Sequence, residues 1–276
     1  MISCGKNFLK ICFLNLMFAF GSCSINVNEI EDNSGYDFNY EGKGGIAITW
    51  DDNAVDDWYK ARNLFKKYNA RCTFFVTNFH KLDEGKIDKL RQLKEDGHEI
   101  ACHTLSHKDA LLYLMDQGIE KYIDNEILPA LDSMRSKGFY PESFAYPFGS
   151  RNSETDEALL KHFRVLRGIT DVSGGVLYNW GWTRILQATG IDNSLKVKTE
   201  SIYYMLENAK ESKRVAVFYG HKITWDTLKV PQGSTAYSRL ESILKKASDL
   251  ELTFFTVSEL DVRKPASAYS RSIKAY

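Results

Sequence analysis

The sequence predicts an α/β fold of a single domain, in which parallel strands form either a barrel or an open doubly wound sheet. From residue 44 onward, short apolar runs alternate with longer amphipathic stretches, an order typical of parallel strand–helix units. About seven such units in roughly 220 residues come close to the size of a barrel. No repeat, low-complexity tract or linker interrupts residues 44–262, so this region is expected to be one domain.

Seven short apolar runs, several of them rich in β-branched or aromatic residues, predict the strands. The first run, Gly45-Ile-Ala-Ile-Thr-Trp50, is apolar almost throughout and predicts a buried strand. The predicted strands cover residues 45–50, 72–76, 98–102, 143–146, 164–167, 214–219 and 253–256.

Six stretches between these runs carry apolar residues at helical spacing. In the second of them Ile87, Leu90 and Leu93 form one stripe, and Gly97 follows where a left-handed residue commonly ends a helix. The predicted helices cover residues 57–68, 86–95, 119–137, 154–163, 201–210 and 236–247.

The composition is that of an ordinary globular protein, with 43% hydrophobic and 26% charged residues in a chain of 276. Lys plus Arg equals Asp plus Glu, at 36 each. Because there is no surplus of positive charge, the composition argues against a nucleic-acid partner and against electrostatic binding to a membrane surface.

The N-terminus indicates a targeting segment. Lys6 and Lys10 precede an apolar run at residues 11–20, and two small residues then precede Cys23, which is the order of a secretory signal. The apolar run is too short for a membrane span, which needs about 20 residues. A cysteine in this place resembles the lipidated first residue of a bacterial lipoprotein, and plain secretion is the alternative.

This interpretation divides the chain into four parts. We expect a signal peptide at 1–22, a polar tether at 23–43, the folded domain at 44–262 and a tail at 263–276. The mature protein would be a lipoprotein of the cell envelope, at the outer membrane or the cell surface. It would contact the membrane only through its lipid anchor.

The cysteines exclude two kinds of site. Of the five cysteines, only Cys72 and Cys102 fall in the predicted domain. Two are too few for a disulfide framework or a cysteine-based zinc site. Both lie in apolar runs and are expected to be buried thiols.

Polar residues that could perform chemistry follow the predicted strands. In α/β proteins the carboxyl ends of parallel strands meet on one rim, which is where functional sites lie. The residues in these places are Asp51, Asp52, His103, His107, the run Tyr146-Pro-Phe-Gly149, and His221.

The histidine pair and the aspartate pair together suggest a catalytic metal site. Two histidines four residues apart, His103 and His107, can share one ion with a carboxylate from Asp51 or Asp52, leaving positions open for water. Each signal alone has an ordinary explanation, such as a turn, a helix cap or surface histidines. Their joint appearance at successive strand ends is much harder to explain in that way.

The ordered set of motifs resembles the polysaccharide deacetylases, carbohydrate esterase family four, over residues 44–262. The resemblance implies a distorted (β/α) barrel, usually with seven strands, acting on N-acetylated glycans or sometimes on O-acetylated xylan. The matching motifs are Thr49-Trp-Asp-Asp52, His103-Thr-Leu-Ser-His107, Ala145-Tyr-Pro-Phe-Gly149, the strand ending in His221, and Phe255-Thr-Val-Ser-Glu259.

The resemblance also implies roles for individual residues. Asp51 would be the general base that deprotonates a metal-bound water, and His221 the general acid that protonates the leaving amine. The backbone N–H of Phe148 would help to hold the tetrahedral oxyanion. The metal, with zinc the commonest ion, would be bound by Asp52, His103 and His107.

One position departs from the pattern. Many family members carry at the start of the proline-containing motif an Arg that fixes the base, and this chain has Ala145 there. The resemblance includes a subgroup with Tyr-Pro-aromatic-Gly that uses a later Arg, so we expect Arg184 to orient Asp51. The alternative is a surface arginine.

The expected substrate is an acetylated glycan, and the expected state is a monomer. Because aromatic faces stack on sugar rings, Trp180, Trp182 and Trp225 are candidate subsite residues, although most loop tryptophans simply pack. Tyr146 and Pro147 of the proline motif are further candidates for substrate contact.

Two other kinds of function remain open at this stage. The same scaffold could hydrolyse O-acetyl esters or small amides. A noncatalytic glycan-binding lipoprotein is the other alternative, but such a module would not need five catalytic side chains.

Overall fold

The computed structural model describes residues 43–170, 175–180, 183–194, 196–226 and 228–261. The predicted signal peptide, the tether up to residue 42, Cys23, Trp182 and the C-terminal tail lie outside these residues. Among the described residues, no helix is both long enough and apolar enough to span a membrane.

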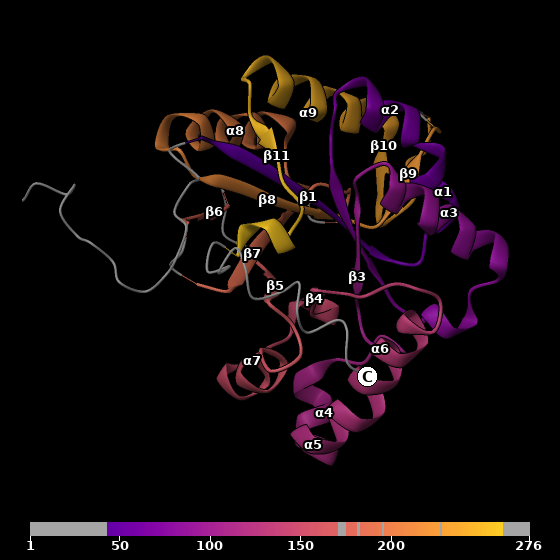
Figure 1. Ribbon diagram of the computed structural model, residues 1–276. Coiled ribbons are helices and arrows are strands. Elements are labelled where there is room, and N and C mark those ends of the chain that lie inside the picture. The colour runs from indigo at the N-terminus through magenta and orange to yellow at the C-terminus, as the bar shows by residue number, and fades with distance from the viewer. Residues whose placement is uncertain (1–42, 171–174, 181–182, 195, 227, 262–276) are drawn as a thin grey trace, which may run out of the picture. The chain divides into compact units, whose positions relative to one another are not determined.

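A closed barrel of seven parallel strands forms the centre of the described region (Figure 1). Each strand pairs with the next, and β8 pairs with β1 from Gly45↔Val215 to Trp50↔Gly220, which closes the ring. The (β/α) barrel is confirmed, and the open sheet is wrong. The barrel strands are β1 (Gly45–Asp52), β2 (Cys72–Val76), β3 (Glu99–Cys102), β4 (Ser143–Ala145), β5 (Val165–Ile169), β7 (Ile185–Gly190) and β8 (Val215–Gly220).

One of the seven strands differs from the prediction. The run at 253–256 forms only a short strand, β11 (Thr253–Phe254), which pairs with the beginning of β1. Its place in the barrel belongs to β7, which has the sequence Ile-Leu-Gln-Ala-Thr-Gly. Gln187 and Thr189 interrupt the apolar run there, which hides the strand from a pattern based on hydrophobicity.

Three further short strands lie beside the barrel. Strand β6 (Leu177–Tyr178) pairs antiparallel with β8. Strands β9 (Lys222–Thr224) and β10 (Ser234–Ala236) form a small parallel sheet of their own.

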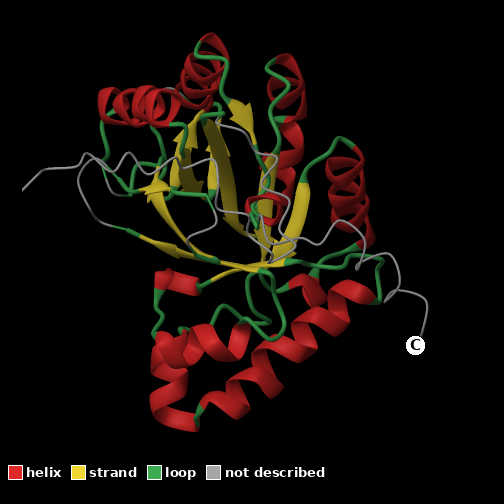
Figure 2. Ribbon diagram, turned by 60° about the vertical axis from the view of Figure 1, so that its left-hand side comes forward, coloured by secondary structure: helices red, strands yellow, loops and turns green. Residues whose placement is uncertain are grey.

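Helices surround the strands on the outside (Figure 2). In α3, the Asp83 side chain caps the first turn by accepting from the Lys86 N–H at 2.9 Å, and the predicted apolar stripe is buried. The α-helices are α1 (Val55–Lys60), α2 (Arg62–Lys67), α3 (Glu84–Glu95), α4 (Ala110–Gln117), α5 (Ile119–Tyr122), α6 (Leu128–Arg135), α7 (Ser153–Leu159), α8 (Thr199–Ser212) and α9 (Tyr237–Asp249).

Single turns of other helix types complete the secondary structure. They are the 3₁₀ turns η2 (Phe79–Lys81), η4 (Pro147–Gly149) and η5 (Ser258–Leu260), and the π-turn η3 (Ile123–Ile127). The helix predicted at 119–137 is therefore divided by η3, and α4 was not predicted. Both differences lie next to the functional site.

Two layers of side chains follow from the alternation of the strands. One face packs under the helices, with Trp50, Trp58 and Phe74 fully buried. The other face fills the barrel, where Ala47 and Phe75 belong to a second buried cluster. The two cysteines are buried free thiols, as predicted.

Polar side chains close the amino-terminal end of the barrel. The Glu99 carboxylate accepts from the Thr73 hydroxyl at 3.0 Å, the Ser143 hydroxyl at 2.7 Å and the Ser258 N–H at 3.0 Å. These hydrogen bonds join β2, β3, β4 and η5 at this end, while the opposite end carries the predicted chemistry.

Candidate metal and catalytic site

Strand register brings the predicted residues together at the carboxyl end of the barrel. Asp52 pairs with Val76, and Val76 pairs with Cys102, so His103 follows directly in the next row. On the other side, Trp50 of β1 pairs with Gly220 of β8, so Asp51 and His221 each follow directly after this pair on neighbouring strands. Residues far apart in sequence therefore meet on one rim.

Asp52, His103 and His107 form a compact group of potential ligands. One ligand atom from each lies within 4.8 Å of the others. Asp52 Oδ1 is 3.2 Å from His107 Nε2 and 3.9 Å from His103 Nε2. Two imidazoles and one carboxylate around a common point are a donor set that suits Zn²⁺ with open positions.

Protonation states also favour a cation at this point. Burial lowers the pKa of His103 to about 4, so its ring is neutral near pH 7. Its Nδ1 lies 2.7 Å from the Ala145 carbonyl oxygen, which requires the proton on Nδ1 and leaves Nε2 as a lone pair directed toward Asp52. Burial raises the pKa of Asp52, but the hydrogen bond from His107 and the nearby histidines outweigh this and set it at about 2.

The backbone around this group is held in unfavourable conformations. Four residues without the freedom of glycine have positive φ angles there: Asp52 (81°), Thr104 (66°), His107 (62°) and Phe148 (58°). Such conformations persist only where surrounding contacts enforce them, and they gather at functional sites.

Arg167 is the residue that pairs with Asp51. The Arg167 guanidinium is completely buried, and its Nη2 donates to Asp51 Oδ2. It lies over the rings of Phe75 and Tyr219, at 5.3 and 5.4 Å from their centroids. Within the described part of the chain, the second carboxylate oxygen, Asp51 Oδ1, has no hydrogen-bond partner.

The expectation that Arg184 orients Asp51 is therefore wrong. Arg184 precedes β7 at the amino-terminal end of the barrel, and its guanidinium donates to the carbonyl oxygens of Arg164 and Phe163, both at 2.7 Å. Arg167 was overlooked, although a charged residue within the apolar run at 164–167 was a signal for it.

Asp192 is a second residue that the sequence did not reveal. Its Oδ2 lies 2.6 Å from His221 Nδ1, and its Oδ1 accepts from the Ser194 N–H at 2.8 Å. Burial lowers the pKa of His221. The hydrogen bond to Asp192 and the charges of Asp51 and Asp52 raise this pKa by more, so that it lies above its usual value. Asp192 follows β7, the unpredicted strand, which explains why it was missed.

One cavity of about 370 Å³ contains these groups. Phe148 lies at its edge with 65% of the side chain exposed, and its ring is 4.7 Å from that of His107. The residues that line the cavity are Asp51, Asp52, His103, His107, Tyr146, Phe148, Gly149, Arg167, Ile169, Tyr219 and His221.

The residues predicted to contact the substrate lie in different surroundings from one another. Tyr146 lines the cavity but is buried, and its hydroxyl donates to Asp156 at 2.9 Å. Pro147 is buried in η4. Trp225 stacks near Tyr237 at 5.6 Å, and its substrate role stays a prediction, as does that of Trp182.

Trp180 is not a subsite residue in this structure. Its indole N–H donates to the carbonyl oxygen of Lys213, just before β8 begins, at 3.1 Å. It packs against Phe255 at 5.1 Å between ring centroids. It therefore lies at the end of the barrel opposite to the catalytic candidates.

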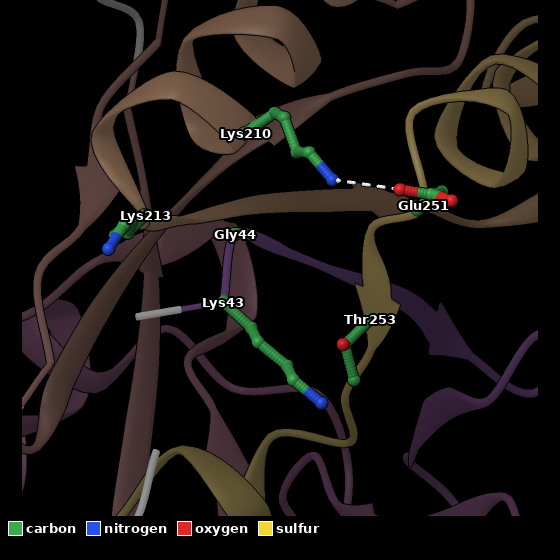
Figure 3. A pocket seen from close by; sticks show the side chains of 6 residues that line it. All are labelled: Lys43, Gly44, Lys210, Lys213, Glu251 and Thr253. Atoms are coloured by element: carbon green, nitrogen blue, oxygen red, sulfur yellow. Dashed lines mark hydrogen bonds and ion pairs between the residues drawn. The ribbon is translucent and has the colours of Figure 1, made fainter. Parts of the chain in front are cut away.

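A second cavity, of about 410 Å³, lies at the amino-terminal end of the strands (Figure 3). Lysines dominate it, and one of them, Lys210, pairs with Glu251 at 3.4 Å. The lining residues are Lys43, Gly44, Lys210, Lys213, Glu251 and Thr253. None of them is a predicted site residue.

Fold and site together define a (β/α) barrel with a candidate mononuclear metal centre at the carboxyl end of its strands. Residues 39–163, which include Asp51, Asp52, both metal-site histidines and Phe148, match the family model described as polysaccharide deacetylase. This part of the chain is therefore similar to the polysaccharide deacetylase family.

Two deacetylases match the chain over part of their length. The chain is 33% identical over 108 residues to a chitin deacetylase of Arthroderma benhamiae, and 35% identical over 85 residues to a peptidoglycan-N-acetylglucosamine deacetylase of Bacillus cereus. These matches cover 37% and 30% of this chain, and only 29% and 36% of the relatives.

A solved structure matches the fold over a larger part of this chain than these relatives do. The peptidoglycan deacetylase PdaC of Bacillus subtilis superposes with a TM-score of 0.51 at 18% identity, covering 80% of this chain and 91% of that one. At this identity the similarity concerns the barrel and not the substrate.

Proposed function

We propose that this protein is a metal-dependent hydrolase that removes N-acetyl groups from amino sugars of a polysaccharide or oligosaccharide, with zinc as its ion. One observation carries the proposal. A single cavity brings together the triad Asp52–His103–His107, a buried carboxylate at Asp51 and a histidine at His221. A carboxylate base and an imidazole acid beside a Lewis acid are the groups that amide hydrolysis requires.

Each group has one task in the proposed reaction. A divalent ion held by Asp52, His103 and His107 would supply a Lewis acid for the acetyl carbonyl and for the attacking water. Asp51 accepts the proton of that water through its unpartnered Oδ1, while Arg167 donates to Oδ2 and holds the carboxylate in place. The backbone N–H of Phe148 stabilises the negative charge that develops on the carbonyl oxygen.

His221 provides the proton for the leaving group. An amine leaves poorly unless it is protonated, so the acid must carry a proton when the C–N bond breaks. Asp192 favours this protonated form, because it holds Nδ1 at 2.6 Å and leaves Nε2 as the donor toward the cavity.

Product analysis on several acetylated glycans tests the proposal. Purified protein is expected to release acetate and an equal amount of free amine from chitin fragments, poly-N-acetylglucosamine or peptidoglycan. Chelator should stop the release and Zn²⁺ should restore it. Acetate from acetylxylan without any amine product would instead indicate an esterase, and glycan binding without release would indicate a noncatalytic module.

Substitution of Asp192 is expected to move the pH profile. The rate falls as pH rises through the pKa of the general acid, because the proton is then lost. Asp192→Asn removes the charge that raises the pKa of His221, so the alkaline limb of kcat/KM should move to lower pH. Asp249→Asn, at an exposed position of α9, is the control. An unchanged alkaline limb in the Asp192 variant would exclude His221 as the titrating acid.

We further propose that the protein is exported and anchored through a lipid on Cys23, since small residues and an apolar run precede this cysteine. Mass spectrometry of the mature N-terminus tests this directly. A mature chain that begins elsewhere, or with an unmodified cysteine, would contradict it.

A further inference from the structure

The segment between the two metal-site histidines is a strained loop. Thr104 and His107 both have left-handed backbone, so the loop would relax to other conformations without external support. Part of this support is local. The Thr104 hydroxyl accepts from the His107 N–H at 2.8 Å, and the Leu105 carbonyl accepts from the Asn78 N–H at 3.1 Å.

The Thr77 hydroxyl also donates to the Thr104 carbonyl at 3.3 Å, but most of the remaining hydrogen bonds come from one residue of another element. Glu126 of the π-turn η3 is only 5% exposed, and it accepts three hydrogen bonds from this loop. Its backbone carbonyl accepts from the Leu105 N–H at 2.9 Å. Its carboxylate accepts from the Ser106 N–H at 2.9 Å and from the Ser106 hydroxyl at 2.5 Å.

The π-turn explains how Glu126 reaches the loop with backbone and side chain together. The Leu128 N–H bonds to the carbonyl of Ile123, five residues back, instead of four. Pro129 follows, and it has no N–H to continue the regular pattern. The helix is thereby widened at Glu126, as often happens beside functional sites.

Packing alone does not explain why a carboxylate is buried at position 126. In the described part of the chain, Glu126 takes part in no ion pair with a cationic side chain, and its charge is met by N–H and O–H donors alone. Burying a carboxylate is costly even when it is hydrogen-bonded. A neutral residue could fill the space, so the carboxylate is expected to serve the loop that Glu126 holds.

We propose that Glu126 is a positioning residue for the metal site: its carboxylate fixes the loop 104–106, and thereby the distance and orientation of His107 relative to His103 and Asp52. This inference rests on the proposed metal-dependent function. Groups that orient metal ligands from outside typically contribute 10–100-fold to metal affinity.

Equilibrium Zn²⁺ affinity of the purified full-length chain, measured by competition with a chromophoric chelator, tests the role. Glu126→Ala is expected to weaken Zn²⁺ binding roughly 10–100-fold. Glu126→Gln keeps one acceptor oxygen for the Ser106 N–H, and its NH2 group can donate to the Ser106 hydroxyl, so this variant should stay within a few-fold of the unaltered protein. Glu120→Ala, at an exposed position in the neighbouring helix α5, is the matched control and should bind normally.

A second measurement separates positioning from a loss of folding. The absorption spectrum of the Co²⁺-substituted protein reports the ligand geometry, and it should change in Glu126→Ala but not in Glu126→Gln. If Glu126→Ala fails to fold, Ser106→Ala removes only the hydroxyl bond and should still weaken Zn²⁺ binding by a measurable factor.

The outcomes distinguish this inference from the proposed function. A Zn²⁺ affinity and a Co²⁺ spectrum in folded Glu126→Ala equal to those of the unaltered protein would overturn the positioning role, even if deacetylation is observed. Conversely, if no acetylated glycan is turned over but the Glu126 variants show the expected affinities, the proposed function fails and the positioning role stands.

Discussion

Replacement of Asp52 by alanine is expected to lower Zn²⁺ affinity by more than about 100-fold and to abolish turnover. The lower bound follows because even residues outside the ligand set cost 10–100-fold. Asp52 also supplies the only carboxylate of the triad Asp52–His103–His107. Metal content after dialysis and competition titration measure the loss.

Replacement of the adjacent Asp51 is expected to affect turnover without affecting metal binding. Asp51→Asn should retain Zn²⁺ and lose roughly 10²–10⁴-fold in kcat, the usual contribution of a general base. Because this substitution leaves the Arg167 charge without its counterion, the rate must be expressed per folded molecule. If Asp51→Asn loses the metal while Asp52→Ala keeps it, the two roles are exchanged. If both retain activity, the hydrolytic mechanism is wrong.

Removal of Arg167 is expected to damage stability and turnover together. Both partners of the Arg167–Asp51 pair are buried, and deleting one member of a buried ion pair typically costs 3–5 kcal/mol, roughly speaking. Asp51 would in addition lose the hydrogen bond that holds its carboxylate in place for the attacking water. Urea unfolding of Arg167→Ala and its kcat at a pH where it remains folded measure the two effects.

Arg184→Ala is the informative control for this experiment. Its loss should also lower the free energy of unfolding, since carbonyl groups at the amino-terminal end of the barrel lose their donor. Turnover per folded molecule should remain at the level of the unaltered protein, because Arg184 lies far from the catalytic end. A rate loss in Arg184→Ala equal to that of Arg167→Ala would contradict the assignment.

The helices and strands were predictable to different degrees. The strand at Cys72–Val76 was located at its observed bounds, because five buried residues in a row leave a clear apolar run. Strand β7 was missed because Gln187 and Thr189 interrupt its pattern. The π-turn at Ile123–Ile127 was missed because Pro129 was the only local sign of it, and a proline does not specify which wide turn precedes it.

The candidate metal site was predictable because its members carry local signatures. The spacing of His103 and His107 and the position of Asp52 after a strand are properties of short segments. In a parallel barrel, strand ends are gathered on one rim whatever the exact register. The sequence patterns therefore determined the parallel strand–helix order and the candidate residues, and the family resemblance carried by these residues chose the barrel, the ligand triad and the acid and base at His221 and Asp51.

The partners of these residues were decided only by the tertiary structure. Arg167 meets Asp51, Asp192 meets His221 and Glu126 meets Ser106 across 116, 29 and 20 residues of chain. Such pairings depend on which strands are neighbours, on their register and on a local widening of one helix. An ion pair or hydrogen bond requires its atoms to approach within a few ångströms, and no short segment of sequence specifies that approach.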